Sequence, residues 1–372
     1  MIRTLSLLLI SFLFATPALA ATTADLQAKY QTALKGGEKV KVLIVPGHEP
    51  GFGGTDYQGV YERDVNVAIA NALAAQLKTD PRLSVTVARD GTSWNAALTD
   101  YFAKEWDSIG EFIQSHKAQT TTTSDVSSSG FQASHNTAPT DVAMRLYGIT
   151  KWANENGVDL AIHVHLNDSG DFNQSGFAIY VPDASFGNAA PSQALGVKIA
   201  SELNRYNATS SLAIENLGVT ADKDLIAVGA YNTADFPSVL VEYSYIYEGK
   251  IQNPVILPLA ERDFANSTYR GIERFFGRPV AYYDTLTLPH RFTSSPAQNT
   301  TSAEVYSLQQ GLRRLNLYPP GGGYFYDCPV GGYFGDCTIS ALKAFQKSKG
   351  IEQTGTLGPR TRAALNAYWG GK

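Results

Sequence analysis

The segment Lys41–Asp64 constrains the fold of this chain more than any other stretch. Its apolar run Val42–Val45 predicts a buried strand, and the Pro-Gly pair that follows ends this strand and leaves His48 at its tip. A glycine-rich loop then leads to Glu62, which begins a segment with an apolar residue every four positions, as in an amphipathic helix. Because active sites of open α/β sheets form at the carboxyl ends of strands, His48 and Glu62 are candidate metal ligands.

The alternation of strands and helices continues to about residue 277. Apolar and period-two runs predict four further strands, at Leu83–Val87, Asp159–Leu166, Phe177–Val181 and Ser238–Ile246. Apolar stripes of helical period predict helices at residues 65–77, 98–112, 141–156, 192–206 and 257–276. The polar run Ala118–Gly130 predicts a flexible loop. Strands that alternate with helices predict an α/β domain of three layers, with a mixed sheet flanked by helices.

The first twenty residues have the three features of a secretory signal peptide. Arg3 supplies a positive charge, Leu5–Phe14 form an apolar core too short to span a bilayer, and residues 18–20 are a small-x-small cleavage site. A buried N-terminal helix is the alternative. No later run is long enough for a membrane span, so we expect an exported protein, in the periplasm or outside the cell at the wall.

A second, smaller unit follows the α/β region. Residues 279–301 are rich in proline and small polar residues, which predicts a linker. Beyond it, apolar stripes predict three short helices that begin near Val305, Ile339 and Pro359. The sequence therefore predicts a small C-terminal three-helix domain over residues 302–369.

Two cysteines and a positive charge distinguish this C-terminal module. Export favours a disulfide between Cys328 and Cys337, because exported proteins meet an oxidising environment. A two-cysteine metal site is the alternative, but no histidine lies near the two cysteines in the sequence. Residues 301–372 carry a net charge of +4, whereas residues 21–300 carry −9. A basic module suits a polyanionic surface such as a cell wall, although an ordinary solvated face explains the charge equally well. We expect no nucleic-acid partner.

Two histidines and one carboxylate within predicted strands are the remaining candidates for chemistry. His163 and His165 are two positions apart on one strand and point to the same face, so either could reach a metal. Glu242 lies in a nearly apolar strand, where a carboxylate is costly unless it is paired or functional. Taken alone, a strand histidine is more often structural, and a lone buried glutamate is as often salt-bridged as catalytic. The coincidence of His48, Glu62, His165 and Glu242 within or at the edge of predicted strands, or at the start of a helix, is what indicates a functional site.

Four motifs in order give the chain a resemblance to a known family. They are V-P-G-H-E-P (45–50), Y-E-R-D-V-N (61–66), H-V-H-L-N (163–167) and P-S-V-L-V-E (237–242). They resemble the patterns D-P-G-H-G-G, Glu before a helix, S-I-H-x-N and P-x-x-L-x-E of the zinc-dependent N-acetylmuramoyl-L-alanine amidases of the type 3 cell-wall family. The resemblance covers about residues 40–277. The chain departs from the family at Val45, Glu49-Pro50 and His163, none of which removes a ligand.

The resemblance implies a Zn²⁺ ion held by His48, Glu62 and His165, with Glu242 as the catalytic base. It implies that the enzyme cuts the amide bond between N-acetylmuramic acid and L-alanine of the peptidoglycan stem peptide. His163 stays open as an alternative ligand or as a residue that supports the ligands, and Asn167 would also support them.

An insertion at Trp94–Ala138 is a further departure from the family. The family includes enzymes whose helical insertion blocks the site until a partner acts. The resemblance therefore leaves open that this insertion gates the site, with an activator of unknown identity.

The C-terminal module resembles a peptidoglycan-binding domain of the three-helix type. The resemblance rests on V-x-x-L-Q-x-x-L (305–312), F-G-D-C-T (334–338), A-L-K-A-F-Q (341–346) and T-G-T-L-G-P-R-T-R-A-A-L-N (354–366). It implies peptidoglycan as the partner and a tether to the wall. Two other functions stay open at this point, a zinc carboxypeptidase or endopeptidase acting within the stem peptide, and a wall-binding protein without catalysis.

Overall fold

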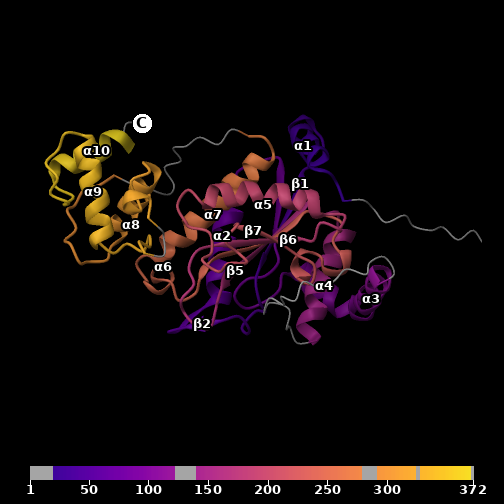
Figure 1. The fold of residues 1–372 in the computed structure, drawn as a ribbon. Coiled ribbons are helices and arrows are strands. Elements are labelled where there is room, and N and C mark those ends of the chain that lie inside the picture. The colour runs from indigo at the N-terminus through magenta and orange to yellow at the C-terminus, as the bar shows by residue number, and fades with distance from the viewer. Residues whose placement is uncertain (1–19, 122–139, 279–290, 324–326, 370–372) are drawn as a thin grey trace, which may run out of the picture.

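The structure is a computed structural model that describes residues 20–121, 140–278, 291–323 and 327–369. The predicted signal peptide lies outside these residues except for Ala20, as do residues 279–290 of the predicted linker. The described residues form an α/β domain and a C-terminal helical module, which stand side by side in Figure 1. Within these residues, no helix combines the length and apolar character that a bilayer span requires.

Six strands form one mixed sheet. They are β1 (Val40–Pro46), β4 (Leu83–Val87), β5 (Leu160–Asn167), β6 (Ala178–Pro182), β7 (Val219–Asp222) and β8 (Ser238–Tyr245), in the order β4-β1-β5-β8-β6-β7. β1 is parallel to β4 and β5, and β5 is parallel to β8. β6 runs antiparallel to β8 and parallel to β7. The predicted mixed sheet is confirmed, and the carboxyl ends of β1, β5 and β8 lie at one edge.

Four helices cover one face of the sheet, namely α1 (Thr23–Thr32), α2 (Glu62–Leu77), α5 (Ala189–Leu203) and α7 (Leu257–Phe275). α7 packs against both α2 and α5 (Figure 1). The strands present alternate side chains to these helices, among them the fully buried Ile44, Ile162 and Val241. Burial of each such side chain contributes about 1.5–3 kcal/mol to the stability of the fold.

Helices α3 (Ala96–Thr121) and α4 (Thr140–Glu155) cover the opposite face. They bury Leu43, Val45 and Ala161, whose side chains point to this face because successive residues of a strand alternate between the two faces of the sheet. Because both faces are covered, these strands read as continuous apolar runs rather than as alternating ones.

Helix α3 is longer than the sequence predicts. It continues to Thr121, four residues into the polar run that begins at Ala118. Ile109 and Ile113 pack in the core against α4 and stabilise this part of the helix. The prediction of a flexible loop is therefore wrong for residues 118–121, and residues 122–130 lie outside the described residues.

Several short elements escape the sequence prediction. They are β7, the hairpin of β2 (Asp56–Tyr57) and β3 (Val60–Tyr61), helix α6 (Gly249–Gln252) and the 3-10 turns Ile226–Val228, Ala230–Asn232 and Pro320–Gly322. Elements of two to four residues contain too few apolar positions to define a period. Their existence depends on pairing partners, as β7 depends on β6.

The C-terminal module contains α8 (Ala303–Arg314), α9 (Asp336–Ser348) and α10 (Pro359–Trp369), as predicted. The predicted disulfide between Cys328 and Cys337 is confirmed and closes the loop before α9. Residues 291–301 pack on the module, since Phe292 is buried and exchanges backbone hydrogen bonds with the side chain of Asn366.

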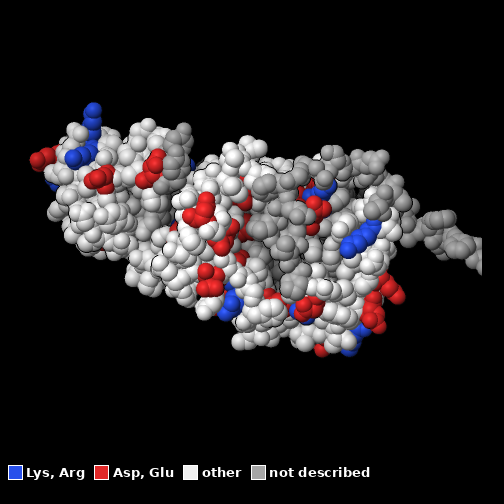
Figure 2. Space-filling model, turned by 60° about the horizontal axis from the view of Figure 1, so that its bottom comes forward, with Lys and Arg blue, Asp and Glu red and all other residues white. Residues whose placement is uncertain are grey.

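Polar contacts join the module to the α/β domain. The Gln310 amide of α8 donates a hydrogen bond to the buried carboxyl of Asp263 on α7 at 2.9 Å, and Arg313 donates to the carbonyl of Asn204 at 2.8 Å. Burial raises the pKa of Asp263 to about 7. Figure 2 shows acidic side chains at several places on the α/β domain, in keeping with its negative net charge.

Candidate metal centre

The end of β1 presents His48 through a close approach of the backbone to another ligand. A Cβ atom on Gly47 would lie 2.2 Å from Cε1 of His165, so only glycine fits at this position. His48 itself has a φ of 68°, in the left-handed region, which costs a residue other than glycine about 1–3 kcal/mol. The surrounding structure therefore holds the His48 backbone in an unfavourable conformation that brings its ring to Glu62.

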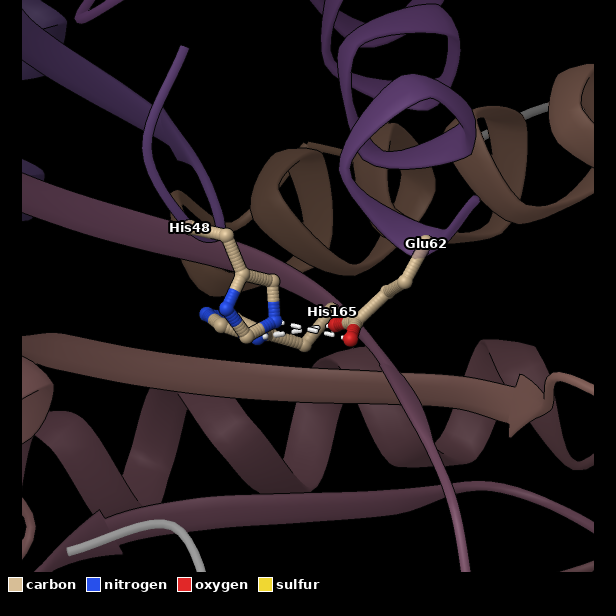
Figure 3. A group of neighbouring side chains, drawn as sticks. All are labelled: His48, Glu62 and His165. Atoms are coloured by element: carbon tan, nitrogen blue, oxygen red, sulfur yellow. Dashed lines mark hydrogen bonds and ion pairs between the residues drawn. The ribbon is translucent and has the colours of Figure 1, made fainter. Parts of the chain in front are cut away.

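Glu62 is the first residue of α2, and both histidines contact its carboxylate. Its carboxylate oxygens lie 2.7 Å from Nε2 of His48 and 3.2 Å from Nδ1 of His165. Figure 3 shows the two rings, one from the loop after β1 and one from β5, directed at this carboxylate. The positive end of the helix dipole favours a carboxylate at this position.

The electrostatics of the cluster favour an anionic Glu62. Burial raises the pKa of the Glu62 carboxyl, but His48 and His165 outweigh burial and hold this pKa well below its usual range. The backbone N–H groups of Thr55 and Leu166 also donate hydrogen bonds to it, at 3.0 and 3.1 Å. The site is thus a buried carboxylate that two imidazole rings and two backbone N–H groups contact.

The donor set fits a zinc ion. One ligand atom from each of His48, Glu62 and His165 lies within 4.8 Å of the other two. Two imidazole nitrogens and one carboxylate oxygen are a known three-ligand set of catalytic zinc sites, which keep a fourth position for water or substrate. The sequence selected these three residues, and the structure brings them together.

Glu242 lies beside this cluster on the neighbouring strand. β5 and β8 pair in parallel with His165 directly opposite Glu242, and the register shifts just beyond this pair. Both residues line a cavity of about 690 Å³ together with His48 and Glu62. Glu242 is 1% exposed, and burial, with contributions from Glu62 and Glu215, raises its pKa well above the usual value. A raised pKa suits a general acid–base.

Glu215 is a carboxylate near the site that the sequence analysis missed. It is buried, and it accepts hydrogen bonds from the hydroxyls of Tyr180 (2.5 Å) and Tyr245 (2.9 Å) and from the Asn167 amide (3.0 Å). It lies in an irregular segment between α5 and β7, where no periodicity indicates burial. Its charge is one cause of the raised pKa of Glu242.

Replacing Glu215 with glutamine should shift the pH dependence of catalysis. Removing its negative charge lowers the pKa of Glu242, so this carboxyl stays deprotonated at lower pH, and we expect the acid limb of kcat/KM to move toward lower pH. The measurement is a pH profile of hydrolysis of a soluble muropeptide. The control is Tyr180→Phe, which removes a hydrogen bond but no charge and should not move the limb downward. An acid limb that stays in place in Glu215→Gln would contradict this coupling.

Arg89 is a second residue that the sequence analysis missed, and it fastens the ligand-bearing segments together. It is buried after β4 and donates hydrogen bonds to the carbonyls of Pro46 (3.1 Å), Gly47 and Arg63 (3.1 Å). Burial lowers its pKa to about 10, so it stays charged at neutral pH. Arg89 thereby ties the end of β1 to the first turn of α2, which carry His48 and Glu62.

The departure at Glu49 has a structural explanation. Its buried carboxylate accepts hydrogen bonds from Nε1 of Trp94 at 3.1 Å and from Arg145 of α4 at 2.7 Å. Glu49 and Trp94 line the cavity with Val142 and Leu146 of α4. Glu49 therefore holds Trp94 of the insertion at the cavity. Trp94, Val142 and Leu146 give one wall of this cavity an apolar surface.

His163 is buried and does not belong to the group of converging ligand atoms found among the described residues. It is 4% exposed, and burial together with His165 lowers its pKa to about 3, so it is neutral. Within the described residues, the potential metal-binding group contains His165 and not His163. Asn167 contacts Glu215 rather than a ligand, as described above.

Two family models match the chain. The model described as N-acetylmuramoyl-L-alanine amidase matches residues 42–274, which is more than half of the chain, and the model described as putative peptidoglycan binding domain matches residues 301–365. No curated protein matches the chain.

Solved structures similar to the chain include three amidases. The N-acetylmuramyl-L-alanine amidase Ami1 of Mycobacterium smegmatis is 15% identical, with a TM-score of 0.44 over 64% of this chain and 98% of that one. The CwlD amidase of Clostridioides difficile, solved with the GerS lipoprotein, is 16% identical, with a TM-score of 0.44 over 64% and 99%. AmiC2 of Nostoc punctiforme is 18% identical, with a TM-score of 0.39 over 65% and 100%.

Proposed function

The chain belongs to the N-acetylmuramoyl-L-alanine amidase family, and we propose that His48, Glu62 and His165 hold a Zn²⁺ ion for its reaction. The reaction is hydrolysis of the amide bond between N-acetylmuramic acid and L-alanine of the peptidoglycan stem peptide. The observation that carries the zinc proposal is the convergence of three ligand atoms within 4.8 Å beside a buried carboxylate on the adjoining strand. A zinc ion held there would polarise the scissile carbonyl and acidify a water molecule.

Glu242 acts as the general base and then as the general acid. Its carboxylate accepts a proton from the attacking water and donates it to the nitrogen of the departing L-alanine. The C–N bond breaks, which leaves a carboxylate on the lactyl group and a free amine on the peptide. The raised pKa of Glu242 supports this role, because it makes the carboxylate a stronger base toward the attacking water.

Metal analysis combined with mass spectrometry of digested muropeptides tests this function. We expect about one zinc ion per purified chain, as in mononuclear sites of this ligand set, and products with a free lactyl carboxyl group and a free L-alanine amine. Release of a D-amino acid instead would identify a peptidase that acts within the stem. A zinc-loaded protein that binds wall but hydrolyses nothing would identify a wall-binding protein without catalysis.

We propose that the C-terminal module holds the enzyme on the wall while the α/β domain cuts. Deleting residues 302–372 should lower binding to insoluble peptidoglycan by about 100-fold, because the linked second binding site is lost. Turnover of a soluble muropeptide should fall much less, since His48, Glu62, His165 and Glu242 all lie in the α/β domain. Sedimentation binding and muropeptide kinetics measure the two effects. Equal losses of wall binding and of muropeptide turnover would contradict the proposal that the module binds the wall while the α/β domain cuts.

We also propose that the protein is exported through its N-terminal signal peptide. Peptidoglycan lies outside the cytoplasm, and the disulfide between Cys328 and Cys337 suits an oxidising compartment. Amino-terminal sequencing of the secreted protein should find a start at Ala21. An intact Met1 on the wall-associated protein would contradict cleavage after Ala20.

A further inference from the structure

Three aromatic side chains from three separate segments gather beside the metal cavity. Tyr57 comes from β2, Phe172 from the loop between β5 and β6, and Tyr247 from the turn after β8. The Phe172 ring centroid lies 5.2 Å from that of Tyr57 and 5.3 Å from that of Tyr247, with the last two rings nearly perpendicular. Tyr57 and Tyr247 pack against the main core, whereas Phe172 is 54% exposed. We call these three residues the aromatic platform.

The backbone of Phe172 has an unfavourable conformation, and the surrounding loop holds it there. Its φ of 58° lies in the left-handed region, which residues other than glycine rarely adopt. The loop is fixed around it, since the Tyr247 hydroxyl accepts a hydrogen bond from the Gln174 N–H at 3.1 Å and lies 2.7 Å from the Ser169 hydroxyl. A large apolar ring is thus held about half exposed on a fixed loop, although burial of such a ring would stabilise the protein.

The platform lies between the metal cavity and the C-terminal module. At one end of its loop, Asp168, Ser169 and Gly170 line the metal cavity. At the other end, Ser175 and Gly176 line a small cavity together with Pro329 and Val330 of the module. A polymer bound by both domains would therefore pass over Phe172.

We propose that Tyr57, Phe172 and Tyr247 bind sugar rings of the glycan strand next to the muramic acid whose amide is cut. The inference rests on the proposed amidase function and names the part of the substrate that this surface recognises. The glycan is the continuous polymer of peptidoglycan, and a strand held by both domains must run from one to the other.

The chemistry of the platform matches a pyranose ring. One face of such a ring presents C–H bonds, which the electron-rich face of an aromatic ring attracts, and its edge carries hydroxyl and amide groups. The exposed carboxylates of Asp168 and Asp171 precede Phe172 in the same loop and can accept hydrogen bonds from those groups. A few polar groups around an apolar surface are the usual composition of a small-ligand site.

Comparison of two substrates that share the same scissile amide tests the proposal. One is a muramoyl-peptide with a single sugar, and the other is a soluble glycan of at least four sugars that bears the same peptide. Phe172→Ala should lower kcat/KM on the long glycan by about tenfold, as expected for the loss of one aromatic contact of about 1.4 kcal/mol. It should leave the single-sugar substrate within about twofold. Phe172→Tyr keeps the ring and should retain wild-type values on both.

Two controls separate this surface from a structural effect. Val197→Ala shortens an exposed apolar side chain on α5 and should change neither substrate. Peptide-free glycan strands should bind wild-type protein about tenfold more tightly than Phe172→Ala in a calorimetric titration, which reports on the platform without turnover. Thermal unfolding of each variant shows that it is folded.

The outcomes distinguish the platform from the amidase function. Equal losses on both substrates, or no loss on either, would overturn the platform while leaving the amidase function standing. A loss that depends on the stem peptide rather than on glycan length would assign the surface to the peptide and overturn the proposal. Wild-type protein that cuts neither substrate at the muramoyl-alanine bond would overturn the amidase function itself.

Discussion

Replacing Glu242 with glutamine should lower kcat/KM by about 10²–10⁴-fold while zinc stays bound. Glutamine has the shape of glutamate but cannot accept the proton of the attacking water. The substitution also suits the site, because it removes a buried charge that burial, Glu62 and Glu215 disfavour, as the raised pKa shows. The variant should therefore fold at least as stably as the wild type, so lost activity cannot be ascribed to unfolding. Muropeptide kinetics and metal analysis of the same preparation provide the two readouts.

Glu242→Ala and Glu38→Gln complete this experiment. Glu242→Ala should be equally inactive and still hold zinc, because the three proposed ligands remain. Glu38→Gln changes a carboxylate whose side chain is 88% exposed and should behave as wild type. Full activity of Glu242→Gln on purified muropeptides would rule out Glu242 as the base.

Replacing His165 with alanine should abolish zinc binding at micromolar metal, whereas replacing His163 should not. Loss of a residue that only supports a ligand typically costs 10–100-fold in metal affinity, so loss of a ligand should cost more than about 100-fold. His165 contacts the Glu62 carboxylate with its ring and lines the cavity, whereas His163 is buried and lies outside the group of converging ligand atoms found among the described residues. Competition with a zinc-binding dye measures both affinities, and activity should follow bound zinc.

Thermal unfolding provides a second readout that does not need turnover. A ligand at 100 times its dissociation constant stabilises the native state by about 2.7 kcal/mol, so added zinc should raise the Tm of wild-type protein and of His163→Ala. It should leave the Tm of His165→Ala unchanged. The reverse result, with zinc retained in His165→Ala and lost in His163→Ala, would make His163 the ligand.

Periodicity predicted the long elements well and the short ones poorly. Helix α2 begins at Glu62 and strand β4 spans Leu83–Val87 as predicted, because apolar residues recur at the period of each element. β7 has no such pattern and forms by pairing with β6. The predicted loop at residues 118–121 failed for a related reason, since packing against α4 extends α3 beyond its apolar residues.

Among the site residues, those in motifs were predictable and those in irregular segments were not. His48, Glu62, His165 and Glu242 were proposed from their positions within or at the edge of strands and at a helix start, together with the family resemblance, and the structure places all four around one cavity. Glu215 shows no such signal, because its burial results from the hydroxyls of Tyr180 and Tyr245, which arrive from two different strands.

The sequence by itself determined the longer strands and helices and which side chains can carry chemistry. These properties are local, since they depend on period, on glycine and proline, and on residue type. The order of the strands was decided only by tertiary structure, because it depends on how the whole chain packs. Placing β5 beside β8 sets His165 opposite Glu242, and the same packing buries Glu215 and brings Tyr57 and Tyr247 together beneath an exposed Phe172.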